Sequence, residues 1–226
     1  MSDLFPEELD VIRDYISGGI VFDVGAYVGE WSRAVMKRVP DVKIHQFEPM
    51  SASFNALTAN FSNETADGRV VANNVAVSDL CGSVVFYHYT NCPVLSTIWK
   101  HDAPTEARLN LTCTEVPTNT ITLDYYCEVF NITHIDFLKI DTEGAEFDVL
   151  KGARSLLERH SIKALQFEYG GCFLNAQVTL KSVFDYLTRY GFSIYKLHPD
   201  GLIHIPVFSD NLEVYDYSNF LATCAL

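Results

Sequence analysis

Short apolar runs alternate with stretches of helical periodicity along most of the chain. The apolar runs have the length of buried strands and lie at residues 20–24, 43–48, 70–77, 135–140, 162–168 and 192–197. The helical patterns lie at residues 3–17, 29–38, 51–61, 122–130, 145–159 and 178–190. Strands that alternate with helices are typical of a doubly wound, mostly parallel α/β sheet. The pattern therefore predicts that fold, preceded by an N-terminal helix within residues 1–19.

Residues 83–117 interrupt this alternation. Residues 84–89 alternate like a half-exposed strand, a polar loop with Asn91, Ser96, Thr97, His101 and Asp102 follows, and residues 111–116 are again extended in pattern. We expect an antiparallel insertion or cap here. Two more extended stretches, near 202–208 and 213–222, are expected to pair antiparallel at the edge of the main sheet.

Length and charge limit the classes of protein to consider. The chain has 226 residues, of which 48% are hydrophobic, so residues 1–226 suit a single domain, and they permit it to be one unit of a larger polypeptide. The net charge of −13 argues against nucleic acid as a partner, because binding of nucleic acid depends on basic residues. No leader and no apolar run of ~20 residues is present, so a cytoplasmic protein without a membrane span is expected. Six cysteines without a C-x-x-C pair predict free thiols, and nothing indicates the oligomeric state.

A glycine turn follows the first predicted strand. Asp23 ends that strand, Gly25 and Gly29 follow, and the next helix starts at once. Glycine tolerates positive φ and allows another molecule close to the backbone, and the free N–H groups of the helix start face the same space. The turn lacks the third glycine of the dinucleotide motif and the G-K-[ST] of the phosphate-binding loop. It therefore predicts a nucleoside site without a polyphosphate.

The second predicted strand ends at Glu48, followed by Pro49. A carboxylate at this place in an open α/β sheet accepts hydrogen bonds from both hydroxyl groups of a ribose. A ribose without a pyrophosphate indicates S-adenosylmethionine (SAM) as the cofactor rather than NAD.

Acidic residues close several predicted strands. Parallel strands place their carboxyl ends at one edge of the sheet, so Asp23, Glu48, Asp141 and Glu168 are expected to surround a shared crevice, with Asn74 nearby. Strand periodicity puts Lys139 on the same face as Asp141. Glu143 and Glu146 flank Gly144 at the next helix start, where they suit either the site or the helix dipole.

Three chemical roles are open for these groups. Asp141 with Glu168 suits a general base that takes a proton from a hydroxyl group. Asp141, Glu143 and Glu168 together suit Mg²⁺ as oxygen ligands. Lys139 either neutralises the carboxylates or is itself a base, if burial lowers its pKa. His101, in the polar loop, is a further candidate base.

Five blocks resemble the FkbM family of SAM-dependent methyltransferases. They are residues 22–29, 47–49, 74–79, 137–153 and 166–168, in that order, and they span about residues 20–170. The resemblance implies a class I, Rossmann-like sheet of seven strands with a reversed edge strand at the C-terminus. It also implies O-methylation of sugars, glycans or natural-product hydroxyl groups.

The resemblance also implies residue roles. Asp23 lies in the first block, and Gly25, Tyr27 and Gly29 would border the methionine part of SAM. Glu48 and Pro49 would lie at the ribose, and Asp141 would face the reacting methyl group or the methionine amine. The stretch beside the adenine would include Asn74, Val75, Ala76 and Ser78. Tyr27 departs from the small polar residue, often Asn, that the family has there.

The leading hypothesis is a SAM-dependent O-methyltransferase that acts on a sugar hydroxyl of a glycan or glycoside. A polyketide or another natural product is the alternative acceptor. A Rossmann NAD-dependent oxidoreductase is a hypothesis of a different class, although no Tyr-x-x-x-Lys pair is evident. A binding module that kept the sheet without catalysis is the third.

Overall fold

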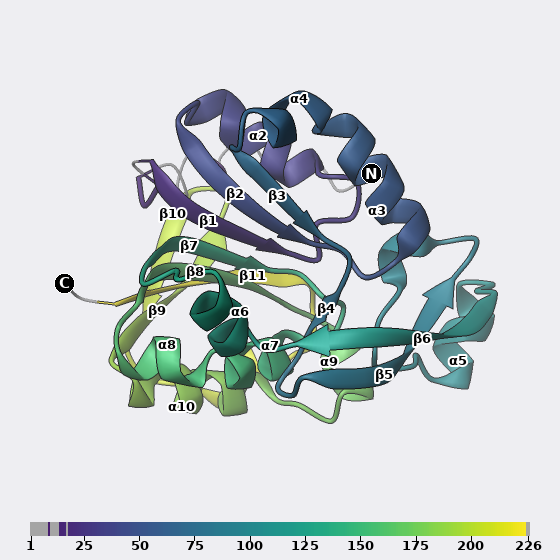
Figure 1. The fold of residues 1–226 in the computed structure, drawn as a ribbon. Coiled ribbons are helices and arrows are strands. Elements are labelled where there is room, and N and C mark those ends of the chain that lie inside the picture. Colours follow the sequence, from purple (N-terminus) through teal and green to yellow (C-terminus); the bar gives the residue numbers. More distant parts are fainter. Residues whose placement is uncertain (1–8, 10–13, 17, 225–226) are drawn as a thin grey trace.

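A computed structural model describes residues 9, 14–16 and 18–224 of the chain. The opening helix predicted at 3–17 lies mostly outside the described residues. The remainder forms an eight-stranded sheet in the order β10-β9-β11-β8-β7-β1-β2-β3 and a smaller sheet in the order β4-β6-β5 (Figure 1). None of the described helices is both long and apolar enough to cross a membrane.

The main sheet and its helices follow the alternation seen in the sequence. Its strands are β1 (Gly19–Val24), β2 (Val42–Phe47), β3 (Val70–Asn73), β7 (Ile135–Ile140), β8 (Ile162–Tyr169), β9 (Phe192–His198), β10 (Gly201–Ile205) and β11 (Ser218–Cys224). The helices are α2 (Glu30–Arg38), α3 (Ser51–Asn60), α4 (Ser62–Ala66), α6 (Leu123–Val129), α7 (Glu146–Gly152), α8 (Arg154–Glu158), α9 (Cys172–Asn175) and α10 (Leu180–Arg189). The 3-10 turns are η1 (Pro93–Leu95) and η2 (Asp210–Leu212).

Helices cover both faces of the main sheet, which is why apolar residues lie on both faces of its central strands. Val21 packs with α2 and α3, whereas the next residue, Phe22, packs with α6 and α7 on the opposite face. Both side chains are fully buried. A sheet that is buried on both faces in this way is expected for parallel strands joined by helices.

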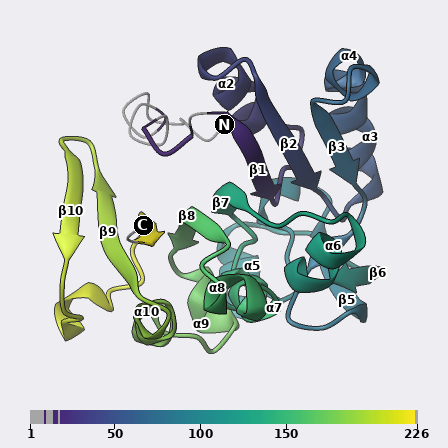
Figure 2. The ribbon, with the colours of Figure 1, turned by 60° about the vertical axis from the view of Figure 1, so that its left-hand side comes forward.

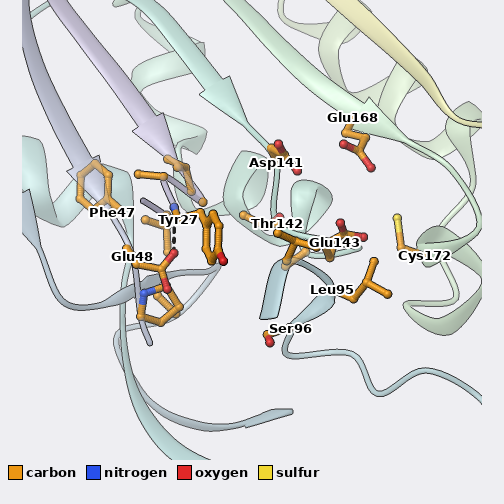
Figure 3. Close-up of a pocket in the computed structure, with 18 of the residues that line it drawn as sticks. Tyr27, Phe47, Glu48, Leu95, Ser96, Asp141, Thr142, Glu143, Glu168 and Cys172 are labelled. Carbon is orange, nitrogen blue, oxygen red and sulfur yellow. Dashed lines mark hydrogen bonds between the residues drawn. The ribbon is translucent and has the colours of Figure 1, made fainter. Parts of the chain in front are cut away.

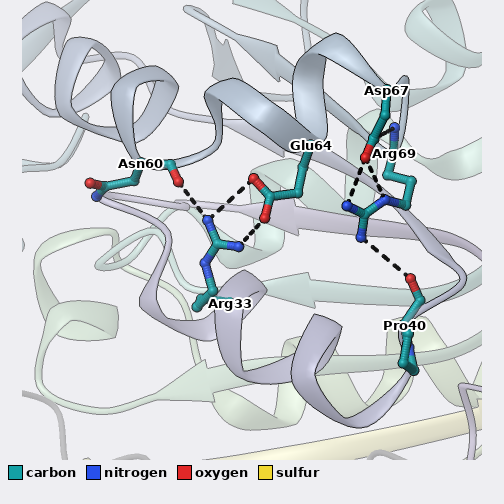
Figure 4. A network of polar contacts seen from close by, with 6 residues as sticks. All are labelled: Arg33, Pro40, Asn60, Glu64, Asp67 and Arg69. Atoms are coloured by element: carbon teal, nitrogen blue, oxygen red, sulfur yellow. Dashed lines mark hydrogen bonds and ion pairs between the residues drawn. The ribbon is translucent and has the colours of Figure 1, made fainter.

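A clamp of polar contacts fixes α2 to the neighbouring helices. The guanidinium group of Arg33 on α2 donates hydrogen bonds to Glu64 on α4 and to the backbone carbonyl of Asn60 on α3 (Figure 4). The same group lies 4.0 Å from the centre of the Phe61 ring. Nearby, Arg69 pairs with Asp67. These contacts hold the helix that follows the glycine turn.

The C-terminal part of the sheet differs from the prediction. Strand β11 is antiparallel to both β8 and β9 and lies between them, so the reversed strand is internal rather than at the edge. The edge is formed by β10, which forms a hairpin with β9 (Figure 2). This additional hairpin strand makes the sheet eight-stranded instead of seven-stranded.

Several predicted elements are shorter than their apolar patterns. The predicted strand 70–77 stops at Asn73, and residues Ala76–Val77 form β4 of the smaller sheet. The predicted helix 145–159 is divided into α7 and α8. The short helix α5 (Ala103–Arg108) follows the predicted polar loop, and α9 lies between the predicted strand 162–168 and the predicted helix 178–190, where no element was predicted. Their few apolar positions give no clear helical period.

The insertion is antiparallel, as predicted. Strands β5 (Gly82–Tyr89) and β6 (Cys113–Ile121) pair antiparallel over their length, and β4 pairs parallel with β6. The segment between β5 and β6 carries η1 and α5 and lies over the carboxyl ends of the main strands (Figure 1).

The glycine turn brings the ends of β1 and β7 into direct contact. Gly25 has φ 79°, and a Cβ atom built there would lie 1.8 Å from the backbone oxygen of Asp141. The N–H of Asp141 donates to the carbonyl of Val24 at 3.1 Å. Glycine is required at position 25 because any side chain would displace the end of β7.

Replacing Gly25 by alanine is expected to lower the free energy of unfolding by about 3–5 kcal/mol, because the new methyl group meets backbone that cannot rotate away. Gly68→Ala is the matched control, since Gly68 has φ 81° with no atom within 4 Å of the added Cβ. It should lose only ~1 kcal/mol, the cost of the left-handed backbone. Urea unfolding measures both. Equal losses would show that contact with Asp141 is unimportant.

Candidate active site

A large cavity lies at the carboxyl ends of the main strands. It has a volume of about 870 Å³ and is lined by the loops after β1, β2, β7 and β8 and by the insertion (Figure 3). The crevice lies where β1 is flanked by β2 on one side and β7 on the other, as expected for an open α/β sheet. The predicted residues that line it are Gly25, Tyr27, Glu48, Pro49, Val75, Ala76, Lys139, Asp141, Glu143 and Glu168.

Glu48 is held at one end of the cavity by backbone groups. Its carboxylate accepts the N–H of Tyr27 at 3.0 Å and the N–H of Met50 at 2.8 Å, and 6% of the residue is exposed. Burial raises the pKa of Glu48 to about 7, although the two hydrogen bonds oppose this shift. Asn74 donates to the carbonyl groups of Glu48 and Pro49, each at 2.9 Å. The carboxylate therefore has one fixed position in the cavity.

Tyr27 occupies a strained place in the glycine turn. Its φ is 50°, in the left-handed region that non-glycine residues seldom adopt and that favours Asn. This conformation gives a physical reason for the Asn that the resemblance led us to expect here, and nothing in the structure explains why Tyr replaces it. The ring of Tyr27 points into the cavity (Figure 3).

Lys139 on β7 connects this strand to the end of β1 and to the turn that follows it. Its ammonium group lies 3.0 Å from the Asp141 carboxylate, 3.4 Å from that of Asp23 and 3.3 Å from the carbonyl of Gly25. Burial alone would lower the pKa of Lys139, but Asp141 and Asp23 outweigh it and raise the pKa above its usual value. Lys139 is thus a fixed cation, and the idea that it is a base of lowered pKa is wrong.

Three further carboxyl groups lie around Asp141. Glu146 is fully buried and accepts the N–H groups of Thr142 and Gly144, so it holds the turn after β7. Burial, together with nearby Asp141, raises the pKa of Glu143 to about 8 and also raises the pKa of Glu146, to about 7. The pKa of Glu168 is raised well above its usual value by burial and then by Asp141. Each of these three groups therefore holds its proton to a higher pH than an ordinary carboxyl group.

The donor set does not fit Mg²⁺. Glu143, Glu168 and Cys172 bring a ligand atom each within 4.8 Å of one another, whereas the Asp141 carboxylate faces Lys139. Mg²⁺ prefers oxygen ligands, and a thiol is a soft ligand. Burial, helped by nearby carboxylates, also raises the pKa of the Cys172 thiol, which keeps it protonated. The predicted set of Asp141, Glu143 and Glu168 is not gathered as metal ligands.

Some predicted site residues lie outside the cavity lining. Asp23 is fully buried beneath the glycine turn, where it accepts the Ser32 hydroxyl at 2.6 Å. Gly29 packs against Phe61, and the backbone N–H of Ser78 pairs with β6. Asn74 acts on Glu48 through the backbone, as described above. These four residues shape the site without lining it.

His101 does not reach the cavity either. Its Nε2 atom lies 3.2 Å from the carbonyl of Leu95, and its Nδ1 atom lies 3.1 Å from the amide nitrogen of Asn175. Both ring nitrogens are therefore engaged, and the residue is only 7% exposed. His101 therefore connects the insertion to α9, and the structure does not support a role for it as the base.

The insertion supplies lining residues that the sequence did not single out. They are apolar, namely Phe86, Pro93, Val94, Leu95 and Ile98. Tyr217 and Asn219 line the cavity from the start of β11. The proline and the isolated apolar residues in a polar loop are the only signal in the sequence, and they do not tell which way the loop folds.

Comparison with known proteins agrees with this geometry. A sequence profile of the methyltransferase FkbM domain matches residues 23–194. Methyltransferase 1 of Beauveria bassiana is 26% identical over 161 residues, which cover 66% of this chain and 64% of the relative. The 31-O-demethyl-FK506 methyltransferase FkbM of Streptomyces tacrolimicus is 30% identical over 156 residues, which cover 60% and 59%. The chain thus matches less than two thirds of the length of these relatives.

Solved structures share the fold. Methyltransferase FkbM from Methylobacillus flagellatus superimposes with a TM-score of 0.57 at 15% identity, over 91% of this chain and 44% of that one. A putative rRNA methylase from Clostridium thermocellum gives a TM-score of 0.52 at 8% identity, over 96% and 95%. At such identities the likeness concerns the fold, which is that of class I methyltransferases. Because the profile matches well over half of its length, the chain belongs to the FkbM family of methyltransferase domains.

Proposed function

We propose that the chain is a SAM-dependent O-methyltransferase that acts on a hydroxyl group of an uncharged small molecule. One observation carries this proposal: the cavity has many more acids than bases. Glu30, Glu48, Asp141, Glu143 and Glu168 line it, against Lys139 as the one cationic side chain among the described lining residues. Such a cavity favours a cationic ligand, and SAM carries a sulfonium and an ammonium group.

The residues present fit SAM better than NAD. Glu48, just after β2, offers a fixed carboxylate to the ribose hydroxyl groups, and Gly25 in the turn after β1 borders the same cavity. The first turn of α2 carries Glu30, which opposes a pyrophosphate at that helix end. The apolar residues Val75, Ala76 and Val77 lie on the cavity wall, where they suit an adenine ring.

When bound, SAM supplies a methyl group on a sulfonium, which is already a good electrophile. The protein then has to orient the acceptor hydroxyl, a contribution that is worth ~7–11 kcal/mol in well-positioned reactions. It also has to remove the hydroxyl proton. Glu168 lies in the cavity near Asp141 and, with its raised pKa, is a stronger base than an ordinary carboxylate once it is ionised. Asp141, paired with Lys139, is the positioning partner.

The acceptor is argued from the apolar wall of the insertion. Five apolar side chains there, from Phe86 to Ile98, suit an acceptor with an apolar surface. This favours a polyketide or another natural-product hydroxyl over the sugar that we expected first. The name of the Streptomyces relative, a 31-O-demethyl-FK506 methyltransferase, supports the same choice. A sugar in a glycan or glycoside is the second candidate, and a cytoplasmic location stays a prediction.

Glu48→Gln is expected to weaken SAM binding by about 10–100-fold, because glutamine replaces one acceptor oxygen by a donor. Isothermal titration with SAM and with NAD measures this, and urea unfolding reports any loss of stability. Glu158→Gln, at an exposed position on α8, is the control and should bind like the unsubstituted chain. Tight binding of NAD without binding of SAM would reverse the cofactor assignment.

Stability is expected to fall between about pH 6.5 and pH 8, because the folded chain keeps carboxyl protons that the unfolded chain has lost. The groups are Glu48 and Glu146, whose pKa is about 7, Glu143, whose pKa is about 8, and Glu168, whose pKa is also raised. At lower pH the buried His45, whose pKa is lowered to about 4, acts in the opposite direction. Urea unfolding at several pH values measures the slope. Glu143→Gln should flatten it and Glu158→Gln should not, whereas a rising curve would contradict the assignment.

Glu168→Gln is expected to lower kcat by about 10²–10⁴-fold, the range for loss of a general base. The assay follows methyl transfer from labelled SAM to a panel of glycosides and macrolide alcohols by mass spectrometry. EDTA should leave turnover of the unsubstituted chain unchanged, since the donor set does not suit Mg²⁺. Full activity of the variant would exclude Glu168 as the base. Loss of activity in EDTA would show that the reaction needs a metal ion after all.

A further inference from the structure

One wall of the cavity belongs to the insertion and faces the carboxylates. Leu95 lies beside Glu143 and Cys172, on the side away from Glu48 (Figure 3). If Glu48 binds the ribose of SAM, as proposed above, the space beside Leu95 is left for the acceptor. Lys139 is already paired with Asp23 and Asp141, so this end offers an apolar surface and acids to the incoming molecule.

The loop that carries Leu95 is fixed by its own hydrogen bonds. Tyr87 and Thr97 exchange two backbone hydrogen bonds, at 2.8 and 3.1 Å. The Ser96 hydroxyl accepts the N–H of Tyr89 at 3.1 Å. The loop is therefore a preformed part of the wall, since these bonds leave its backbone one conformation.

A pair of side chains then fixes the loop to α9. His101 donates from Nε2 to the carbonyl of Leu95 and accepts at Nδ1 from the amide of Asn175. The amide oxygen of Asn175 accepts the N–H of Asp102 at 3.2 Å. This pattern requires a neutral imidazole, and burial lowers the pKa of His101 accordingly. Since Asn175 and Cys172 share α9, the pair connects both sides of the space beside Leu95.

We propose that Leu95, held by the His101–Asn175 pair, sets the size of the molecule that the cavity admits beside Glu143 and Cys172. Leu95 is the specificity residue, and His101 and Asn175 are positioning residues that act through it. The molecules admitted are hydroxyl compounds with an apolar surface and without phosphate or carboxylate groups. The inference rests on the proposed function only in that it calls this molecule the acceptor.

Cys172 provides a reporter that needs neither SAM nor an acceptor. Its thiol lines the space beside Leu95 and is 8% exposed. The folded chain is treated with iodoacetamide or with the bulkier N-phenylmaleimide at mildly alkaline pH, for long enough that Cys172, which its raised pKa makes slow to react, is measurably modified in the unsubstituted chain. Modification of each cysteine is then followed by peptide mass spectrometry. Cys81, which is exposed and lies outside the cavity lining, reports the intrinsic reaction rate in every variant.

Leu95→Ala is expected to speed the reaction of Cys172, and more so with the bulkier reagent, whereas Leu95→Phe is expected to slow it. Asn175→Leu should speed it by on the order of fivefold, as for loss of one hydrogen bond. Asn175→Asp should preserve the original rate, because a carboxylate pairs with a protonated His101 and still accepts the N–H of Asp102.

A double variant separates the two routes by which Asn175 can act. If Asn175 acts through Leu95, adding Asn175→Leu to Leu95→Ala should give no further increase. The proposal is overturned if both Leu95 variants react at Cys172 like the unsubstituted chain with both reagents. It is also overturned, as regards the positioning pair, if the effects of Leu95→Ala and Asn175→Leu multiply.

The proposed function is tested independently of this outcome. Calorimetry with SAM on the unsubstituted chain measures binding at the Glu48 end of the cavity. It does not involve alkylation of Cys172. Failure of SAM to bind would overturn the proposed function while leaving the alkylation pattern intact. Circular dichroism of each variant confirms that it is folded before its rates are compared.

Discussion

The structure depends on the contact between the ends of β1 and β7. Gly25 lies so close to the backbone oxygen of Asp141 that no side chain fits between them, and Lys139 contacts both segments. The loop proposed to receive the cofactor and the acids proposed to act on the acceptor are thereby held at a fixed separation. The proposed methyl transfer would need this constraint, because alignment of the two bound molecules would be the protein's main contribution to it.

A bound cation would relieve the accumulation of acids in this region. Glu48 and Glu146 are buried and Glu143 and Glu168 are partly buried, and burial raises the pKa of all four. Like charges at short range are costly unless protons or cations neutralise them. Lys139 pairs with both Asp141 and Asp23 and offsets one of their two charges. The others are expected to gain from a bound cation, which joins stability to ligand binding.

The sequence predicted most reliably the features that depend on the alternation of strands and helices and on positions where the backbone requires glycine. Apolar runs located the parallel strands, and the convergence of strand ends placed Glu48, Asp141 and Glu168 in one cavity. It failed where tertiary contacts decide. Burial alone suggested a lysine of lowered pKa, whereas the paired carboxylates of Lys139 reverse that effect. The polar neighbours of His101 suggested catalysis, whereas both of its ring nitrogens form hydrogen bonds, with Leu95 and Asn175.

The position of β11 shows the same limit. Its pattern identifies a strand, but only pairing with both β8 and β9 shows that it lies inside the sheet. The wall of the insertion likewise depends on how one loop folds back on β5. Periodicity describes a segment by itself, and these features belong to pairs of segments distant in the chain.

The entry and exit of the insertion lie side by side, since Gly82 pairs with Thr120 at the base of the β5–β6 ribbon. Everything between these positions closes upon itself before the chain returns to the main domain. The ribbon can therefore be lengthened, shortened or exchanged without altering β1 and β2, which Gly25 and Glu48 directly follow. Such an arrangement would allow the same main sheet to carry different walls around the cavity.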